Sequence, residues 1–144
     1  MATLIEIYGK PIAKNRPRFY RRGDHVGTYS DQKVEENKYK MLLKTEIRQY
    51  KCFPKETPVF VFIDFMMPVP KAWPKFKIKQ LEKGHVFWHI KKPDLDNLAK
   101  WVKDCGNKIL WTDDSIVCGL NARKKYSLNP GTKIQIIDAG GGSK

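Results

Sequence analysis

The sequence predicts a single α+β domain in which a small mixed β-sheet packs against helices. Residues 3–9 alternate between apolar and polar side chains, which is typical of a strand with one buried face. Residues 58–70 form a β-branched and aromatic run bounded by prolines, which indicates a buried strand. Residues 95–105 repeat apolar side chains at three- and four-residue steps, which indicates one buried helical face.

The other elements are predicted in chain order. Residues 10–25 contain two prolines among many cations, and we expect a basic loop there because proline opposes a helix. A helix is expected over residues 31–50, with Ser30 or Asp31 as its N-cap. A short helix is expected near residues 76–81, and strands over residues 115–127 and 132–139, joined by the turn LNPG. The domain is assigned to residues 1–139, and residues 140–144 to a flexible Gly-rich tail.

The chain is strongly basic, with 28 Lys and Arg against 15 Asp and Glu and a formal net charge of +13 at pH 7. Such a surface points to a polyanionic partner, most often nucleic acid, which it binds through counterion release. The alternative from charge alone is a basic protein with no special partner. No apolar run reaches the ~18 residues of a membrane span, so no membrane association is expected.

Cysteine usage and the N-terminus predict a cytoplasmic protein. Cys52, Cys105 and Cys118 are far apart and form no C-x-x-C pair, so free thiols are expected rather than a Cys-rich zinc site. The N-terminal residues lack the charged and apolar pattern of a signal peptide.

The stretch KPDLDNLAKWVKDCGNKILWTDDS, residues 92–115, gathers acidic residues within this basic chain: Asp94, Asp96, Asp104, Asp113 and Asp114. Neighbouring carboxylates repel and raise one another's pKa, so a fold keeps them together mainly when a cation or a proton relieves the repulsion. A calcium loop is excluded, because Ala99 and Cys105 occupy the positions of its Gly and Glu. A divalent metal that bridges carboxylates and a phosphodiester would make this segment the centre of a nuclease.

The local sequence predicts how these carboxylates are arranged. Pro93 favours an extended Lys92, so we expect Asp94 at the end of a loop or strand and Asp96 as the helix cap. If residues 94–96 are extended, both carboxylates point to one side, as oxygen ligands of Mg²⁺ would. Of Asp113 and Asp114, one is expected to join the cluster, although a DDS stretch is also typical of a turn.

Two further spacings have competing interpretations. Lys100 lies four residues from both Asp96 and Asp104, which by spacing alone favours a surface salt-bridge ladder over a phosphate-binding ammonium. His85 and His89 have the spacing of a helical zinc pair, but the segment lacks the glutamate of HExxH and is strand-like. A structural or DNA-contacting role is therefore favoured for both histidines.

The expected DNA contacts come from the N-terminal basic segment and from the residues before Asp94. Cations there would bind phosphates, and the interleaved aromatic residues would stack on bases or sugars. An ordinary solvated loop is the alternative for residues 10–25. The candidate DNA-binding residues are Lys10, Lys14, Asn15, Arg16, Arg18, Arg21, Arg22, Lys91 and Lys92.

Residues 92–115 resemble the signature of the RusA family of Holliday junction resolvases, small endodeoxyribonucleases common in prophages and phages. The shared pattern is a basic residue, D-x-D-N-L-x-K, a helix, and D-D before a strand. The segment GKPIAKNRPRFYRR is also similar to the family's basic N-terminal loop. By contrast, residues 71–88 have no role that the resemblance supplies.

The resemblance implies a Mg²⁺-dependent homodimer, with Mn²⁺ as a substitute metal, that resolves four-way DNA junctions by paired symmetric nicks in recombination and repair. It implies metal-binding and catalytic roles for Asp94, Asp96 and Asp114, a catalytic role for Lys100, and supporting roles for Asn97 and Asp113. A nuclease of broader selectivity for flaps and forks is one alternative. A nucleic-acid-binding module without catalysis, whose aspartates cap helices and turns, is another.

Overall fold

A four-stranded mixed sheet organises the protein in a computed structural model that describes residues 2–15, 18–29, 32–48 and 50–140, with backbone alone for residues 18–20 and 28–29. The strand order is β1-β6-β4-β5. The strands are β1 (Ala2–Tyr8), β4 (Val59–Pro68), β5 (Val117–Ser127) and β6 (Gly131–Asp138). The β4–β5 pair is parallel, and the other two pairs are antiparallel.

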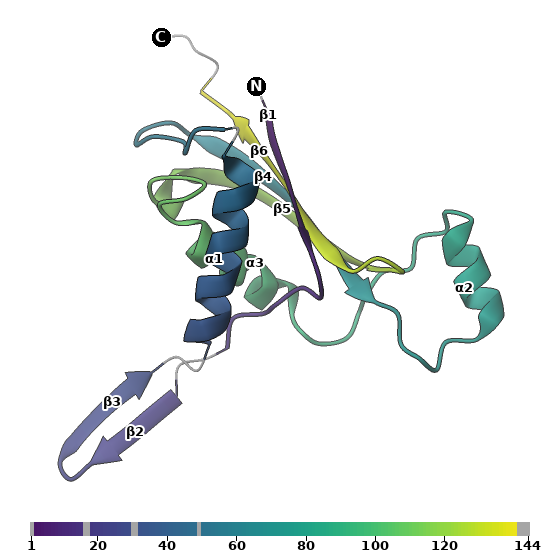
Figure 1. The fold of residues 1–144 in the computed structure, drawn as a ribbon, viewed down its shortest axis with the longest axis horizontal. Helices are drawn as coiled ribbons and strands as arrows, with labels where there is room; N and C mark the ends of the chain where they lie inside the picture. The colour runs from purple at the N-terminus through teal and green to yellow at the C-terminus, as the bar shows by residue number, and fades with distance from the viewer. Residues whose placement is uncertain (1, 16–17, 30–31, 49, 141–144) are drawn as a thin grey trace.

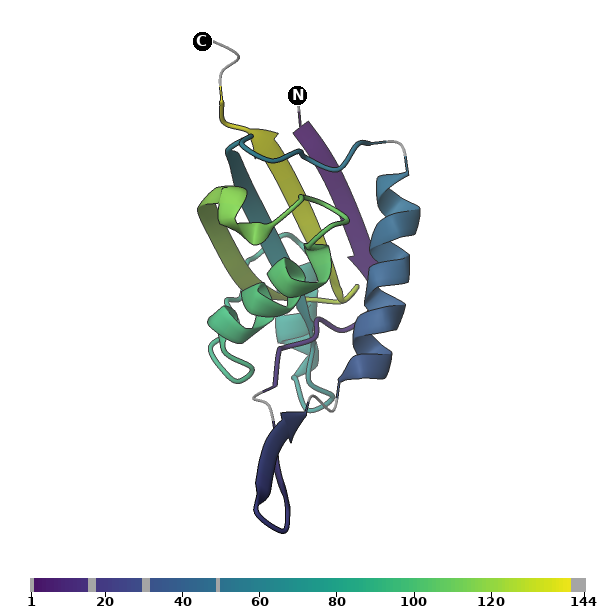
Figure 2. The same cartoon turned by 90° about the vertical axis from the view of Figure 1, so that its left-hand side faces the viewer.

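Helices α1 (Lys33–Ile47) and α3 (Leu95–Gly106) cover one face of this sheet, as Figure 2 shows. Two elements stand away from these layers in Figure 1: a hairpin of β2 (Arg18–Arg22) and β3 (His25–Tyr29), and the helix α2 (Lys75–Glu82). A short 3₁₀ helix, η1 (Asp114–Ile116), precedes β5.

The core lies between the sheet and the two covering helices. Alternate residues of β4 point toward the helices, and Val59, Val61 and Ile63 are almost completely buried there. Helix α3 contributes an apolar face that is likewise buried: Leu98, Trp101, Val102 and Cys105. Burial raises the pKa of the Cys105 thiol to about 12, so this side chain is neutral and acts as an apolar group.

The predicted α+β class with a mixed sheet is confirmed, and the predicted strands and helices form with shifted ends. Residues 10–25 differ, because much of this predicted loop belongs to the β2–β3 hairpin, where exposed cations hide the strand pattern. The turn after β5 leads to β6, but β4 lies between the two strands. The predicted caps Ser30 and Asp31 and tail residues 141–144 lie outside the described residues.

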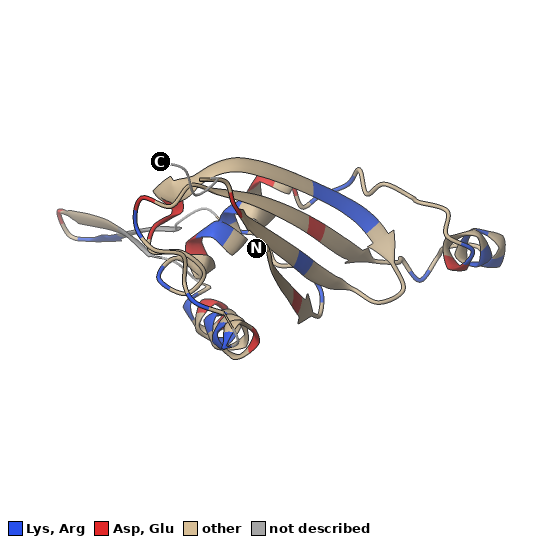
Figure 3. Cartoon of the chain, turned by 90° about the horizontal axis from the view of Figure 1, so that it is seen from above, with Lys and Arg blue, Asp and Glu red and all other residues tan. Residues whose placement is uncertain are grey.

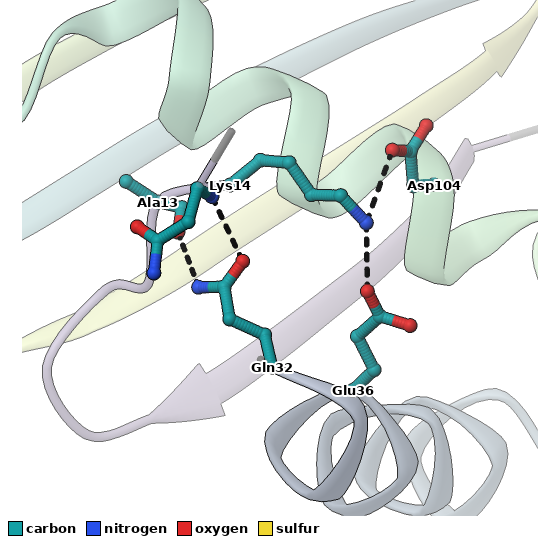
Figure 4. A network of polar contacts seen from close by, with 6 residues as sticks. Ala13, Lys14, Gln32, Glu36 and Asp104 are labelled. Atoms are coloured by element: carbon teal, nitrogen blue, oxygen red, sulfur yellow. Dashed lines mark hydrogen bonds and ion pairs between the residues drawn. The ribbon is translucent and has the colours of Figure 1, made fainter. Parts of the chain in front are cut away.

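A polar network fixes the segment from which the hairpin leaves the domain (Figure 4). The buried Gln32 side chain donates to the Ala13 carbonyl and accepts from the Asn15 N–H, both at 2.8 Å. The Lys14 N–H donates to the Asn97 carbonyl in the first turn of α3 at 2.9 Å. Residues 13–15 are therefore held against both α1 and α3.

The Lys14 ammonium completes this network with two carboxylates. Its Nζ lies 2.6 Å from Glu36 Oε1 and 3.6 Å from Asp104 Oδ2. Burial alone lowers the pKa of Lys14, but the hydrogen bond and charge of Glu36, together with the charge of Asp104, outweigh burial and raise it. The stabilisation is complete below the unfolded-state pKa of 10.5 and is lost as pH rises through the higher folded-state value.

We expect Lys14→Met and Glu36→Gln each to lower the free energy of unfolding at pH 7 by about 1–3 kcal/mol, since each leaves a partly buried partner unsatisfied. The double variant should lose less than the sum of the two single variants. Urea unfolding of the four proteins measures both effects. Glu35→Gln, on the exposed side of the same helical turn, is the matched control, and equal effects at Glu35 and Glu36 would contradict the network's role.

Candidate active site at the N-terminus of α3

The first turn of α3 presents two of the expected carboxylates to solvent. Asp94 is the N-cap, with extended backbone angles φ −68° and ψ 146°, and its side chain makes no capping hydrogen bond. Its carbonyl instead accepts from the Leu98 N–H at 3.2 Å. The exposed Asp94 carboxylate is therefore not used by the helix and is available to another ligand.

Asp96 is an exposed residue inside the first turn of α3, so the prediction that it caps the helix is wrong. The helix begins at Leu95 because Leu95 already packs against the core below Leu98 and Val102. Residues 95 and 96 are helical, so the two carboxylates are not aligned by an extended segment as predicted. Instead, both carboxylates lie in the same helix start, where negative charge is favourable.

Lys124 of β5 supports the loop that leads into Asp94. Its Nζ donates to the carbonyls of Lys91 and Pro93, at 2.5 and 2.6 Å, across a cis Lys92–Pro93 peptide. Burial lowers the pKa of Lys124, and the charge of nearby Asp94 partly offsets this effect. Sequence reasoning missed this lysine. The feature that could have indicated its role is its position in β5: Lys124 lies opposite the buried Phe65, on the face of the sheet that the helices cover. A lysine on such a face needs polar partners.

The loop after α3 holds the other predicted pair, Asp113 and Asp114. Buried Trp111 anchors this loop, and its indole N–H donates to Asn107 Oδ1 at 3.0 Å. Asp113 caps η1 by accepting from the Ser115 N–H at 3.1 Å, and its hydrogen bonds with Ser115 lower its pKa. Asp114 is the first residue of η1 and is half-buried.

Within one chain, Asp114 does not lie beside Asp94 and Asp96. Asp94 lies near Lys124, whereas Asp114 precedes Val117, and at ~3.3 Å per residue β5 separates these points by roughly 20 Å. Asp94 immediately precedes α3, whereas Asp114 follows the loop after its other end. Within the described parts of the chain, no three Asp, Glu, His or Cys side chains are close enough to hold a metal ion. The expected convergence within one chain is therefore not found.

Lys100 does not form the salt-bridge ladder that its spacing favours. Asp104 pairs with Lys14 instead, and the described residues provide no ion pair for the exposed Lys100 ammonium. Lys100 lies one helical turn after Asp96, on the same side of α3. The Asn97 side chain is exposed in the same turn. These placements leave Lys100 available to a ligand near Asp94 and Asp96.

The candidate DNA-binding residues divide into three groups. The Lys14 ammonium is bonded within the polar network described above, and the Asn15 backbone N–H takes part in the same network. Arg16 and the side chain of Arg18 lie outside the described residues. Five others are exposed: Lys10, Arg21, Arg22, Lys91 and Lys92. Figure 3 shows Lys and Arg spread over both covering helices, α2 and the far end of β5.

The two histidines lie in an extended segment rather than on a helix. The His89 N–H donates to the Lys124 carbonyl at 3.1 Å, and its ring packs on Tyr126 with centroids 4.9 Å apart. Burial lowers the pKa of His89, and the charges of Lys124 and Lys91 lower it further. His89 is therefore neutral at pH 7, and the helical spacing of a zinc pair does not apply.

The chain is similar to known proteins over nearly all of its helices and strands. The model of the family described as endodeoxyribonuclease RusA matches residues 8–137. The chain is also 33% identical over 133 residues to a Bacillus subtilis (strain 168) protein named uncharacterized protein YqaN, with 90% of this chain and 92% of that protein covered. None of the helices in the described ranges has the length and apolar content needed to cross a membrane. The chain belongs to the RusA family of endodeoxyribonucleases.

Proposed function

We propose that this protein is a homodimeric, Mg²⁺-dependent endonuclease that resolves four-way DNA junctions by paired symmetric nicks in recombination and repair. The observation that supports this most is the uncovered pair Asp94 and Asp96 at the start of α3, in a RusA-family chain with a formal charge of +13. Without a cation, these carboxylates would repel the DNA phosphates that the basic surface attracts.

The donor set at α3 fits Mg²⁺ in its chemistry. Mg²⁺ takes hard oxygen ligands and keeps several waters, so one or two carboxylates together with a substrate phosphate are sufficient. The exposed Asp94 and Asp96 supply such oxygens, and Mn²⁺ would accept the same ligands. When bound, the metal would polarise the phosphodiester and lower the pKa of a coordinated water.

The protein's own groups would position the DNA strand around this point. Lys124 holds the Lys91–Pro93 loop and so fixes where Asp94 stands. Lys100, one turn further along α3, would hold the scissile phosphate and stabilise its developing charge. The exposed cations of the hairpin and of the Lys91–Lys92 pair would bind the flanking backbone.

Asp114 fits this scheme through the dimer. A two-fold protein suits a two-fold junction, because the same surface can act on both opposing strands. Roughly 20 Å of β5 lies between Lys124, which is near Asp94, and Val117, which follows Asp114, and no three metal-ligating side chains gather within the described residues of one chain. We therefore assign Asp114 to the site of the other subunit, with Asp113 positioning it by capping η1.

The first test is cleavage of a synthetic four-way junction by Asp94→Asn. We expect the Mg²⁺-dependent nicking rate to fall more than about 100-fold while junction binding in EDTA is retained, because the change removes a ligand charge and leaves the basic surface intact. Asp138→Asn, an exposed aspartate at the end of β6, is the matched control. Unchanged nicking by Asp94→Asn would refute the assignment.

The same assay, run beside flap, fork and duplex substrates, separates the proposed resolvase from its alternatives. Paired symmetric nicks near the branch point favour the resolvase. Equal cleavage of flaps and forks indicates the broader nuclease. Salt-sensitive binding without product under any metal indicates the non-catalytic module.

A mixture of two inactive variants tests the shared site. When Asp94→Asn and Asp114→Asn subunits are co-expressed and assort randomly, half of the dimers contain one subunit of each kind. Each of these heterodimers has one intact site out of two, so the mixture should regain roughly a quarter of the wild-type sites. Those heterodimers should give single nicks rather than paired ones. Each variant alone is the control, and a mixture as inactive as both controls would place Asp114 outside a shared site.

The hairpin cations are tested by the salt dependence of junction affinity in EDTA. We expect the double change Arg21→Gln and Arg22→Gln to reduce the slope of log affinity against log salt by about 0.9 per lost phosphate contact. Lys133→Gln, an exposed cation on the opposite face of the sheet, should leave the slope unchanged. An unchanged slope in the hairpin variant would exclude these arginines from the DNA interface.

A further inference from the structure

Residues between 70 and 91, together with Tyr126, line a cavity beside the candidate active site, and of these residues the mechanism above uses only Lys91. Residues 87–89 run antiparallel to the edge of β5: the Tyr126 N–H donates to the Phe87 carbonyl at 3.0 Å, and Trp88 pairs with Lys125. The rest of the segment, with α2, extends outward from this attachment in Figure 1. The attachment holds an otherwise peripheral segment against the sheet.

Aromatic side chains form the wall of this cavity. Trp73 packs on Tyr126 and Phe87, with ring centroids 4.7 and 5.4 Å apart. Trp88 also lines the cavity and remains 54% exposed. The volume is about 460 Å³, within the ~300–1,000 Å³ of small-molecule sites. Trp88 is therefore exposed at this cavity, whereas Trp73, Phe87 and Tyr126 are half-buried behind it.

The charged groups at this cavity are cations. Lys77 lies over the Trp73 ring at 4.1 Å from its centroid, and Lys91 contributes to the same wall. No acidic side chain lines the described cavity. A ligand that offers a flat π surface together with a negative charge matches this lining, and a nucleotide has both.

The cavity is adjacent to the candidate catalytic carboxylate. Lys91 lines the cavity, and Asp94 follows three residues later, a span of at most ~11 Å. The Lys91 carbonyl is itself bonded to Lys124, which fixes this short connection. A nucleotide in the cavity would therefore lie next to a strand held at Asp94.

We propose that this cavity binds an unpaired nucleotide of the DNA substrate, whose base stacks on the exposed Trp88 ring and whose phosphate pairs with Lys91. The inference rests on the proposed function and deepens it, since it names the DNA feature that is recognised beside the cut. A branch point interrupts base stacking, so unpairing and turning out a base costs less there than inside an uninterrupted duplex. The segment would thereby favour branched over uninterrupted DNA.

The test measures binding without cleavage, in EDTA, with short oligothymidylate and a duplex of the same length as probes. Oligothymidylate should quench the fluorescence of the wild-type protein, since Trp73 and Trp88 line the cavity whereas Trp101 and Trp111 are buried, and the more exposed Trp88 should carry most of the change. Trp88→Leu should lose most of this quenching and bind oligothymidylate about tenfold more weakly, with duplex affinity changed less than twofold. Trp88→Phe should restore the affinity, because a phenyl ring can still stack.

Phe76→Leu is the matched control, because Phe76 is an exposed aromatic residue of α2 that does not line the cavity. Lys91→Gln should weaken oligothymidylate binding, whereas Lys75→Gln at the exposed start of α2 should not. Thermal unfolding of each variant confirms that it is folded.

Three results would overturn the proposal: equal oligothymidylate affinity in wild type and Trp88→Leu, equal weakening for oligothymidylate and duplex, or a changed sedimentation coefficient with unchanged affinity. The second would indicate general backbone contact, and the third a contact between protein copies. Junction cleavage in Mg²⁺ is measured separately. Wild-type quenching without cleavage would contradict the proposed function while leaving the subsite supported.

Discussion

The apolar face of α3 fixes where the candidate catalytic groups lie. Leu98, Trp101 and Val102 are almost completely buried against the sheet, so the helix can neither slide nor turn without exposing large side chains. Its start must then lie beside Lys124, and its end beside the loop that Trp111 anchors. The carboxylates before and after this helix are therefore held at opposite ends of β5, whatever their own electrostatic preference.

Around this frame, chemically similar cations have different roles. Lys14 and Lys124 use their ammonium groups inside the structure, the first on two carboxylates and the second on two backbone carbonyls. Both fix a segment that approaches the start of α3. Lys100, in contrast, is exposed beside that start. The cations of the chain thus divide into some that are bonded inside the structure and others that are exposed, and net charge alone does not distinguish the two groups.

The sequence predicted those parts of the fold that local patterns encode. The strand over residues 58–70 and the helix over residues 95–105 have clear periodicity, and both form. The hairpin was not predicted because exposed cations mask the alternation of its side chains. The role of Lys124 was not predicted because its partners are backbone carbonyls of a segment distant in the sequence. The position of Asp114 relative to Asp94 depends on how α3 lies across the sheet. Spacing along the chain carries no information about that distance.

The two outlying elements contribute nothing to the described core: α2 has no buried residue, and the core cluster contains no residue of the hairpin. The described residues of these elements can therefore change at little cost in stability, whereas the buried face of α3 cannot change without disturbing the sheet. Both elements nevertheless attach next to the start of α3, through the Lys14–Asn97 hydrogen bond and through Lys91. In the proposed function, the chemistry therefore depends on the rigid helix, and DNA recognition depends on the attached elements. It follows that substrate selectivity in this fold can diverge while Asp94 and Asp96 stay in place.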